Sequence, residues 1–265
     1  MIADRQTLVE ALATTAREAG EAILVIVRRG FDIEAKGDRS PVTEADRAAE
    51  QVILAALARL APGIPVIAEE EVAAGRIPDH GTTYFLVDPL DGTKEFVRGG
   101  DDYTVNIGLI EDGGPVLGVV YAPATGTMYG GSAGGGAWRE DGAGRTPIKA
   151  RERGAHLTAV ASKSHFSKPT ADYLEAVGAS DHVSIGSSLK FCLVAEGRAD
   201  IYPRLGPTCE WDTAAGHAVL LAAGGLVDGP DGSALGYGKA RFLNPGFVAT
   251  AGWKPPAIGP FLDQG

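Results

Sequence analysis

The sequence passes from an apolar run into an acidic turn at Tyr84-Phe85-Leu86-Val87-Asp88-Pro89-Leu90-Asp91-Gly92-Thr93-Lys94. The apolar start predicts a buried strand, and that strand delivers Asp88 at its end. Pro89 then forces a turn, because the proline ring fixes φ and removes a backbone donor. Around such a turn the carboxylates of Asp88 and Asp91 can converge on one point, and Gly92 lets the backbone approach closely.

The donors gathered in this turn are two carboxylates, a backbone carbonyl and a hydroxyl. These are hard oxygen ligands, which favour Mg²⁺ over a soft metal. A plain turn whose acids cap backbone donors remains the alternative. Haloacid-dehalogenase phosphatases also carry Asp-Gly-Thr, but their two acids are separated by one residue. A calcium-binding EF-hand loop needs acids at alternate positions and a distal glutamate, and this segment has neither.

Three further polar clusters bear on the choice. Glu69-Glu70-Glu71 follows a second buried strand at 64–68, and adjacent carboxylates repel one another unless a cation or solvent intervenes. By itself this cluster is explained by a solvated acidic turn. Asp212 stands at the start of an apolar helix, where it could be a simple N-cap. In the cluster at 36–46, Thr43 and Asp46 have nearly the spacing of a capping box.

Length, composition and charge limit the function classes. A chain of 265 residues with 45% hydrophobic and 22% charged residues predicts one large or two medium globular domains. The net charge of −10 argues against nucleic acid or anionic lipid as a broad-surface partner. A phosphate-ester substrate would therefore need a local cation, for which bound metal is the obvious candidate. Two cysteines build no disulfide framework, and the five histidines have no zinc-site spacing.

The start of the chain shows no signal-peptide pattern, and the apolar run at 22–27 is too short to span a bilayer. We therefore expect a cytoplasmic protein with no integral membrane segment.

Hydrophobic periodicity predicts an α/β architecture of layered helices and sheets. One helix should bury Leu8, Leu12, Ala16, Ala19, Ile23 and Ile26 and end at Gly30. A second, from Thr43 to about Leu60, should bury Ala45, Ala49, Val52, Ala56 and Leu60. Runs at 104–110 and 115–121 predict a hairpin, and a glycine-rich patch follows at 130–136. A strand is expected at 157–161 and helices at 169–177, 189–196 and 212–223. The polar stretch 149–154 predicts a boundary between domains at 1–148 and 149–265.

In this order, the acidic turn, the Asp-Pro-Leu-Asp-Gly-Thr loop and the late Trp-Asp-x-x-Ala-Gly resemble the inositol-monophosphatase-like superfamily. Four other segments resemble its bisphosphate nucleotidase branch: Asp-Gly-Thr-Lys-Glu-Phe at 91–96, Gly-Ser-Ser-Leu-Lys-Phe-Cys at 186–192, Ala-Asp-Ile-Tyr-Pro-Arg at 199–204 and Phe-Leu-Asn-Pro-Gly-Phe at 242–247. The resemblance covers almost the whole chain and implies an αβαβα sandwich.

The resemblance also implies a ligand set. Glu69, Asp88 and the Leu90 carbonyl would hold one Mg²⁺, and Asp88, Asp91 and Asp212 would hold a second. A third, weaker Mg²⁺ near Glu69 is left open, and the alignment can slip by one so that Glu70 replaces Glu69.

The implied catalytic residues are Asp46, Glu69 and Thr93. Asp46 would orient the Thr93 hydroxyl toward the attacking water, and Glu69 with Thr93 would accept or position the proton of that water. The sequence shows neither a Cys-x5-Arg loop nor an assembled Ser-His-Asp signature, so we expect no nucleophile from a side chain.

The implied reaction releases the 3'-phosphate of adenosine 3',5'-bisphosphate to give AMP, with 3'-phosphoadenosine 5'-phosphosulfate as a second substrate. The expected substrate contacts are Leu90, Asp91, Gly92, Thr93, Lys94, Gly186, Ser187, Ser188, Lys190, Arg204, Glu210 and Asp212. Lys190, Arg204 or Lys94 would supply the cation that an extra phosphate needs. Ser187 or Ser188 could equally be only an N-cap.

Alternative functions stay open from the sequence. The same chemistry could act on inositol monophosphate or fructose 1,6-bisphosphate, or the fold could serve a non-catalytic metal- or nucleotide-binding protein. The resemblance implies inhibition by Li⁺ and a place in sulfur metabolism, and it leaves open a homodimer and peripheral association with the inner face of the cell membrane.

Overall fold

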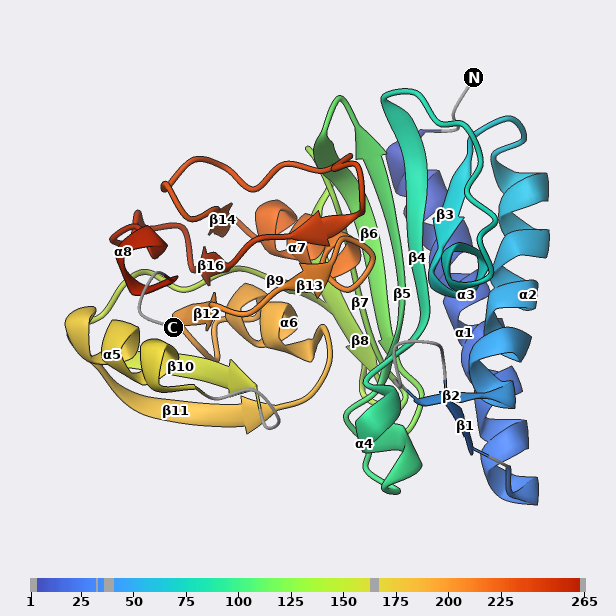
Figure 1. Ribbon diagram of the computed structural model, residues 1–265, viewed down its shortest axis with the longest axis horizontal. Coiled ribbons are helices and arrows are strands. Elements are labelled where there is room, and N and C mark those ends of the chain that lie inside the picture. Colours follow the sequence, from blue (N-terminus) through green and yellow to red (C-terminus); the bar gives the residue numbers. More distant parts are fainter. Residues whose placement is uncertain (1–3, 32, 36–40, 163–166, 263–265) are drawn as a thin grey trace.

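The computed structural model describes residues 4–31, 33–35, 41–162 and 167–262 (Figure 1). The first part of the polar cluster at 36–46, residues 36–40, lies outside this description. The described chain forms alternating layers of helix and sheet.

A seven-stranded sheet forms the second layer, and its strands are ordered as they occur in the chain. They are β3 (Val66–Ala68), β4 (Thr83–Asp91), β5 (Thr104–Glu111), β6 (Gly114–Ala122), β7 (Thr127–Ser132), β8 (Gly136–Asp141) and β9 (Gly144–Ile148). β3 and β4 are parallel, and the other neighbours are antiparallel. The predicted hairpin is confirmed as β5–β6. Its turn residues Asp112 and Gly113 have φ of 49° and 76°, which a two-residue turn requires.

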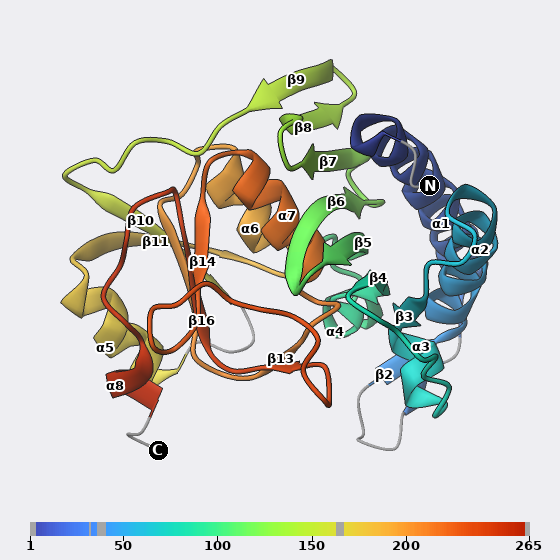
Figure 2. The same ribbon diagram turned by 90° about the horizontal axis from the view of Figure 1, so that it is seen from above.

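Two long helices cover the outer face of this sheet (Figure 2). α1 (Arg5–Arg29) buries the whole predicted apolar face and ends at Gly30. α2 (Glu44–Leu60) buries Ala45, Ala49 and Ala56 as predicted. The prediction was wrong for Val52 and Leu60.

The buried stripe of α2 instead passes through Ile53 and Leu57, following 3.6 residues per turn, and Leu60 is 38% exposed. β1 (Ile33–Ala35) and β2 (Pro41–Thr43), which lie between the two helices in the sequence, pair in antiparallel fashion.

The middle layer consists of α6 (Leu189–Ala195) and α7 (Ala214–Ala222), which pack on each other. α7 lies directly on the first sheet, over a row of glycines. Gly108, Gly118 and Gly131 are cross-strand partners on β5, β6 and β7. A Cβ atom at Gly118 would lie 2.4 Å from the Ala215 carbonyl oxygen, so the glycine row is what allows this close approach.

We expect Gly118→Ala to destabilise the protein by about 1–3 kcal/mol, because the added methyl group must push the α7 backbone off the sheet. Urea unfolding measures the loss. The matched control is Gly81→Ala, where a Cβ atom meets nothing within 4 Å. Equal stability of the two variants would contradict the role given to the glycine row.

A five-stranded sheet forms the fourth layer, in the order β11-β10-β12-β16-β14. Its strands are β10 (Leu157–Ser162), β11 (Ala179–Ile185), β12 (Ile201–Arg204), β14 (Leu226–Asp228) and β16 (Phe247–Thr250). α5 (Lys168–Ala176) packs on β11 and β12, and α8 (Gly259–Leu262) packs on α5. The strand expected at 157–161 and the three helices expected after it are therefore confirmed.

The resulting order of layers is the αβαβα sandwich that the sequence predicted (Figure 1). Residues 149–156 connect β9 to β10 between the two sheets, while the division into domains at residue 148 stays a prediction. The remaining elements are α3 (Glu69–Ala73), α4 (Thr93–Val97), β13 (Thr208–Cys209) and β15 (Leu243–Asn244). In the described ranges, no helix combines the length and the apolar character that crossing a membrane requires.

Candidate active site

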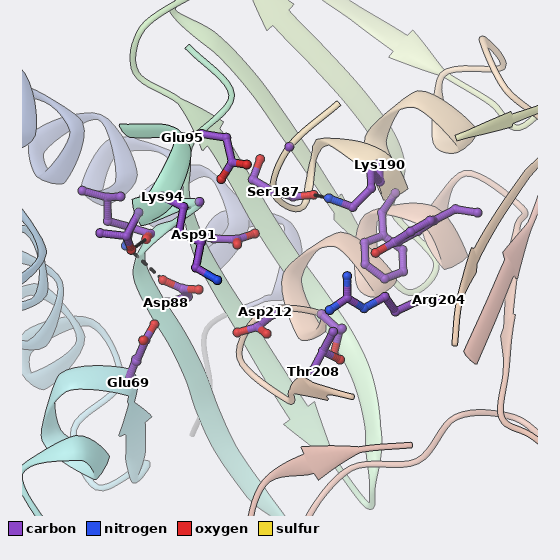
Figure 3. Close-up of a pocket in the computed structure, with 17 residues that line it drawn as sticks. Glu69, Asp88, Asp91, Lys94, Glu95, Ser187, Lys190, Arg204, Thr208 and Asp212 are labelled. Atoms are coloured by element: carbon purple, nitrogen blue, oxygen red, sulfur yellow. Dashed lines mark hydrogen bonds between the residues drawn. The ribbon is translucent and has the colours of Figure 1, made fainter. Parts of the chain in front are cut away.

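A cavity of about 270 Å³ opens where the end of β4 faces α6 and the residues before α7 (Figure 3). Most of the predicted site residues line it. The lining residues are Glu69, Asp88, Leu90, Asp91, Gly92, Thr93, Lys94, Glu95, Gly186, Ser187, Lys190, Phe191, Tyr202, Arg204, Thr208, Asp212 and Thr213.

The register of two parallel strands brings the first two acids together. Ala68 of β3 pairs with Val87 of β4, so the next residues, Glu69 after the end of β3 and Asp88 within β4, lie side by side. Asp88 is 2% exposed, and its Oδ1 accepts a hydrogen bond from the Leu90 amide at 3.0 Å. The prediction that the strand ends at Asp88 in a turn at Pro89 was wrong: β4 continues to Asp91, and its pairing with β5 only shifts register between Asp88 and Asp91, as at a β-bulge.

The hydroxyl of Thr93 lies beside Asp46, as the resemblance implied. Thr93 Oγ1 is 3.4 Å from Asp46 Oδ1 and 3.1 Å from the Leu90 carbonyl oxygen. Asp46 also completes a capping box at the start of α2, where its Oδ2 accepts hydrogen bonds of 2.8 Å from the amide and the hydroxyl of Thr43. These bonds hold Oδ2 and leave Oδ1 directed toward Thr93.

Asp212 reaches the cavity from the other half of the chain. It precedes α7, whose N-cap is Thr213, so the alternative that Asp212 is a simple N-cap does not hold. Its Oδ2 accepts a hydrogen bond from the Cys209 amide at 2.9 Å. Because α7 lies directly on the first sheet, Asp212 faces the acids at the end of β4.

Burial perturbs several acids at or near the cavity. Desolvation raises the pKa of Asp91, against the opposing effects of the Lys190 charge and of hydrogen bonds from the Ser188 backbone amide and the Asn106 side chain. The pKa of Asp212 is raised well above its ordinary value by desolvation, then by the charges of Asp91 and Glu69.

Glu50 on α2, which the sequence analysis did not identify, accepts a hydrogen bond from the Glu70 amide at 2.9 Å. Desolvation raises the pKa of Glu50 to about 7.

These shifts predict that metal-free protein loses stability as the pH rises. A carboxyl group with a raised pKa binds more protons in the folded than in the unfolded state, so its contribution favours folding at low pH and is lost between its unfolded and folded pKa. For Glu50 that window runs from 4.5 to about 7. We expect the melting temperature in chelator to fall by several degrees from about pH 5.5 to about pH 8.

Mg²⁺ should reverse this trend, since metal binds the ionised carboxylates. Melting curves with and without Mg²⁺ at each pH provide the measurement. The variants Glu50→Gln and Asp212→Asn should each flatten the metal-free slope. A metal-free melting temperature that rises over the same pH range would contradict the assignment.

Two cationic side chains lie across the cavity from the acids. Figure 3 shows Glu69, Asp88, Asp91 and Asp212 on one side and Lys190 and Arg204 on the other. Lys190 is 6% exposed and donates a hydrogen bond to the Ser187 carbonyl at 2.5 Å. Burial lowers the pKa of Lys190 to about 8.

Arg204 donates to the carbonyls of Gly206 and Pro207 at 3.3 and 3.2 Å, which directs the guanidinium along the cavity edge. Lys94 also lines the cavity, from α4.

The turn before α6 closes the cavity with a strained backbone. Ser187 has φ of 52°, and the Gly186 amide donates to Asp102 Oδ2 at 3.1 Å. Ser188 takes the N-cap position of α6 but makes no capping bond, whereas Ser187 Oγ accepts a hydrogen bond from the Leu189 amide at 3.5 Å, so the cap alternative fails for Ser188 alone.

Three predicted residues do not line the cavity. Asp46 contacts Thr93 from behind, and Ser188 lies beneath the surface at 1% exposure. Glu210 is fully buried, and its carboxylate accepts bonds from the Gly238 amide and from the amide and ammonium of Lys239. These bonds direct Glu210 away from the cavity, so it anchors residues 238–239 instead of contacting a ligand there.

The sequence analysis also missed residues of the cavity wall. They are Glu95, Phe191, Tyr202, Thr208 and Thr213. Glu95, Phe191 and Tyr202 stand inside motifs that were identified, where adjacency to Lys94, Lys190 and Arg204 was the available signal.

The donor set suits a hard cation. The cavity presents carboxylate, hydroxyl and carbonyl oxygens, which favour Mg²⁺. Among the described residues, no three Asp, Glu, His or Cys side chains stand close enough together to hold a metal ion between them.

Comparisons with known proteins point to one family. The model of the inositol monophosphatase family matches residues 4–257. The 3'(2'),5'-bisphosphate nucleotidase CysQ of Salmonella typhimurium is 48% identical over 246 residues, which are 92% of this chain and 99% of that protein. The Escherichia coli K12 protein of the same name is 47% identical over 91% of this chain and 98% of its own length.

Solved structures agree. The crystal structure of CysQ from Bacteroides thetaiotaomicron, a bacterial member of the inositol monophosphatase family, superposes with a TM-score of 0.79 at 37% identity and covers 94% of this chain and 98% of that one. An inositol monophosphatase from Anabaena gives 0.76 at 27% identity, covering 98% and 96%. The chain belongs to the inositol monophosphatase family and is similar over nearly its whole length to that family's bisphosphate nucleotidases.

Proposed function

We propose that this protein is a magnesium-dependent 3'(2'),5'-bisphosphate nucleotidase that releases the 3'-phosphate of adenosine 3',5'-bisphosphate to give AMP. One observation carries the proposal: a single cavity has acids on one side and two cations on the other (Figure 3). The acids can bind the metal ions that assist hydrolysis of one phosphate group. The two cationic side chains can bind a second phosphate group of the same substrate. The identity of up to 48% with bisphosphate nucleotidases supports the same substrate class.

Enzymes of this family depend on metal, typically Mg²⁺. In this chain Glu69, Asp88 and the Leu90 carbonyl would hold one Mg²⁺, and Asp88, Asp91 and Asp212 a second; a third would bind more weakly near Glu69. Bound Mg²⁺ supplies charge neutralisation of the phosphate, activation of water near neutral pH and stabilisation of the leaving oxygen.

Asp46 and Thr93 would orient the attacking water. The Thr93 hydroxyl has one proton, and Asp46 Oδ1 lies at 3.4 Å to accept it. When Asp46 takes this bond, the Thr93 oxygen can accept a hydrogen bond from water. Glu69, which lies beside Asp88, would take the proton of that water.

Lys190 and Arg204 would bind the 5'-phosphate. Lys190 is held by the Ser187 carbonyl and lies 5.6 Å from the Tyr202 ring, so its ammonium is already ordered before substrate arrives. The sulfated analogue, 3'-phosphoadenosine 5'-phosphosulfate, has an anionic group at the same 5' position, and we propose it as a second substrate. The proposal includes neither a homodimer nor a membrane contact.

A substrate panel tests the proposed function. Phosphate release is compared, as kcat/KM, for adenosine 3',5'-bisphosphate, its sulfated analogue, inositol 1-phosphate and fructose 1,6-bisphosphate, with Mg²⁺ and after chelation. We expect the bisphosphate nucleotide to exceed the inositol phosphate by at least about tenfold, because only the former fills the cationic side. Preference for the inositol phosphate would contradict the nucleotidase assignment, and turnover in chelator would contradict the metal.

A further inference from the structure

Two polar side chains behind the cavity, Asn106 and Ser188, are unusual for the strand and the helix in which they lie. Asn106 lies in the interior of β5 at 0% exposure, and its Oδ1 has no hydrogen-bond partner within the described residues. Asparagine is depleted in strands, and a buried unpaired carbonyl costs free energy. Ser188 takes the N-cap position of α6 without capping the helix, so the stabilisation that a serine usually gives there is absent.

Both side chains direct their hydrogen bonds to the acids of the cavity instead. Asn106 Nδ2 donates to Asp91 Oδ2 at 3.3 Å and to Ser188 Oγ at 2.9 Å. Ser188 Oγ donates to the backbone carbonyl of Asp212 at 2.6 Å. A continuous chain of bonds therefore runs from the carboxylate at the end of β4 to the residue that precedes α7.

The direction of each bond in this chain is fixed by the chemistry of its ends. The Asp212 carbonyl only accepts, so it takes the single proton of the Ser188 hydroxyl. The Ser188 oxygen must then accept from its other neighbour, which is Asn106. Ionised Asp91 can also only accept. The side-chain nitrogen of Asn106 therefore donates to both Ser188 and Asp91, and Oδ1 of Asn106 is left without a partner among the described residues.

Asp212 is thus held at two points. Ser188 fixes its carbonyl, and the Cys209 amide fixes Oδ2 of its carboxylate at 2.9 Å. Asp91 is held by Asn106, whose backbone pairs with Asp88 across the sheet. The bonds through Asn106 and Ser188 link the two halves of the acidic group, which arise 121 residues apart, at positions 91 and 212.

We propose that Asn106 and Ser188 are positioning residues that hold Asp91 and Asp212 at the separation needed to bind one divalent cation together. This inference rests on the proposed function, in which those two carboxylates share a cation. Hydrogen-bonding partners behind metal ligands typically change metal affinity by about 10–100-fold when removed. We expect the lower end, about tenfold, for the loss of one link in this chain.

The test uses Ser188→Ala, Asn106→Leu and the double variant. Leucine keeps the branched shape of asparagine and removes its donors. The matched control is Thr104→Val, which removes a fully buried hydroxyl without a partner in the described structure, from the same face of the same strand. Mn²⁺ binding to each metal-free protein is measured by calorimetry, together with its melting temperature.

We expect each single variant to bind Mn²⁺ about tenfold more weakly, and the double variant to lose no more than either single one, because one broken link already interrupts the chain. Thr104→Val should bind Mn²⁺ as the wild type does. Turnover of the single variants should return at high Mg²⁺, whereas a merely structural defect would not be rescued in this way.

Unchanged Mn²⁺ affinity in both single variants would overturn the inference, and so would losses that simply add in the double variant. If the wild type binds Mn²⁺ and hydrolyses the bisphosphate nucleotide while these results hold, only the inference fails. If the wild type binds no Mn²⁺ at all, the proposed function fails, and the inference fails with it. A loss of melting temperature without a loss of Mn²⁺ affinity would assign Asn106 and Ser188 to stability alone.

Discussion

Replacing Asp91 with Asn is expected to lower kcat for phosphate release by about three orders of magnitude, or about 4 kcal/mol of transition-state stabilisation. The substitution removes the charge that Asp91 would offer to the second Mg²⁺ and keeps the shape of the side chain. It also removes a carboxylate whose pKa is raised by desolvation. The melting temperature of the metal-free protein should therefore rise while turnover falls.

The opposite signs of these two effects separate chemistry from folding. Asp79→Asn, at an exposed loop position, is the matched control and should leave both quantities unchanged. Steady-state phosphate release at saturating Mg²⁺ and melting curves in chelator provide the measurements. Wild-type turnover by Asp91→Asn would remove the second metal from the proposed mechanism.

Replacing Lys190 with Met should lower kcat/KM for adenosine 3',5'-bisphosphate by about 100-fold, since a buried charge-assisted bond to phosphate is worth about 1.5–3 kcal/mol. Methionine fills similar space in this buried site without a charge. Adenosine 3'-phosphate lacks the 5'-phosphate, so its kcat/KM should change little.

The comparison of the two substrates is the decisive measurement for Lys190. Lys149→Met, at an exposed position, controls for loss of net charge. Equal losses on both substrates would show that Lys190 supports the site as a whole and does not bind the second phosphate.

Local patterns were sufficient where one segment determines its own structure. The apolar spacing in α1 defined its buried face, and the Asp112-Gly113 pair marked the β5–β6 turn. The acids at 69, 88 and 91 were found because they follow closely on the apolar runs at 64–68 and 84–87. In α2 the same method predicted wrongly that Val52 and Leu60 are buried. The burial of residues at the edge of an apolar stripe depends on which other elements pack against them.

The remaining features depend on pairing between distant segments. The row formed by Gly108, Gly118 and Gly131 exists only once β5, β6 and β7 are in register. The only local sign of a role for Asn106 is that it is a polar residue within an otherwise apolar strand. Glu210 lies in a motif that suggested contact with a ligand. Its carboxylate instead accepts hydrogen bonds from Lys239, which lies 29 residues further along the chain.

The central claim is that the acids at the ends of β3 and β4 and before α7 bind divalent cations in one shared cavity. Crystals grown with Mn²⁺ test it directly, through the anomalous scattering of the ion. We expect Mn²⁺ in the cavity, in contact with the carboxylates of Asp88, Asp91 and Asp212. A Mn²⁺-activated enzyme whose anomalous map shows no ion against these side chains would contradict the account.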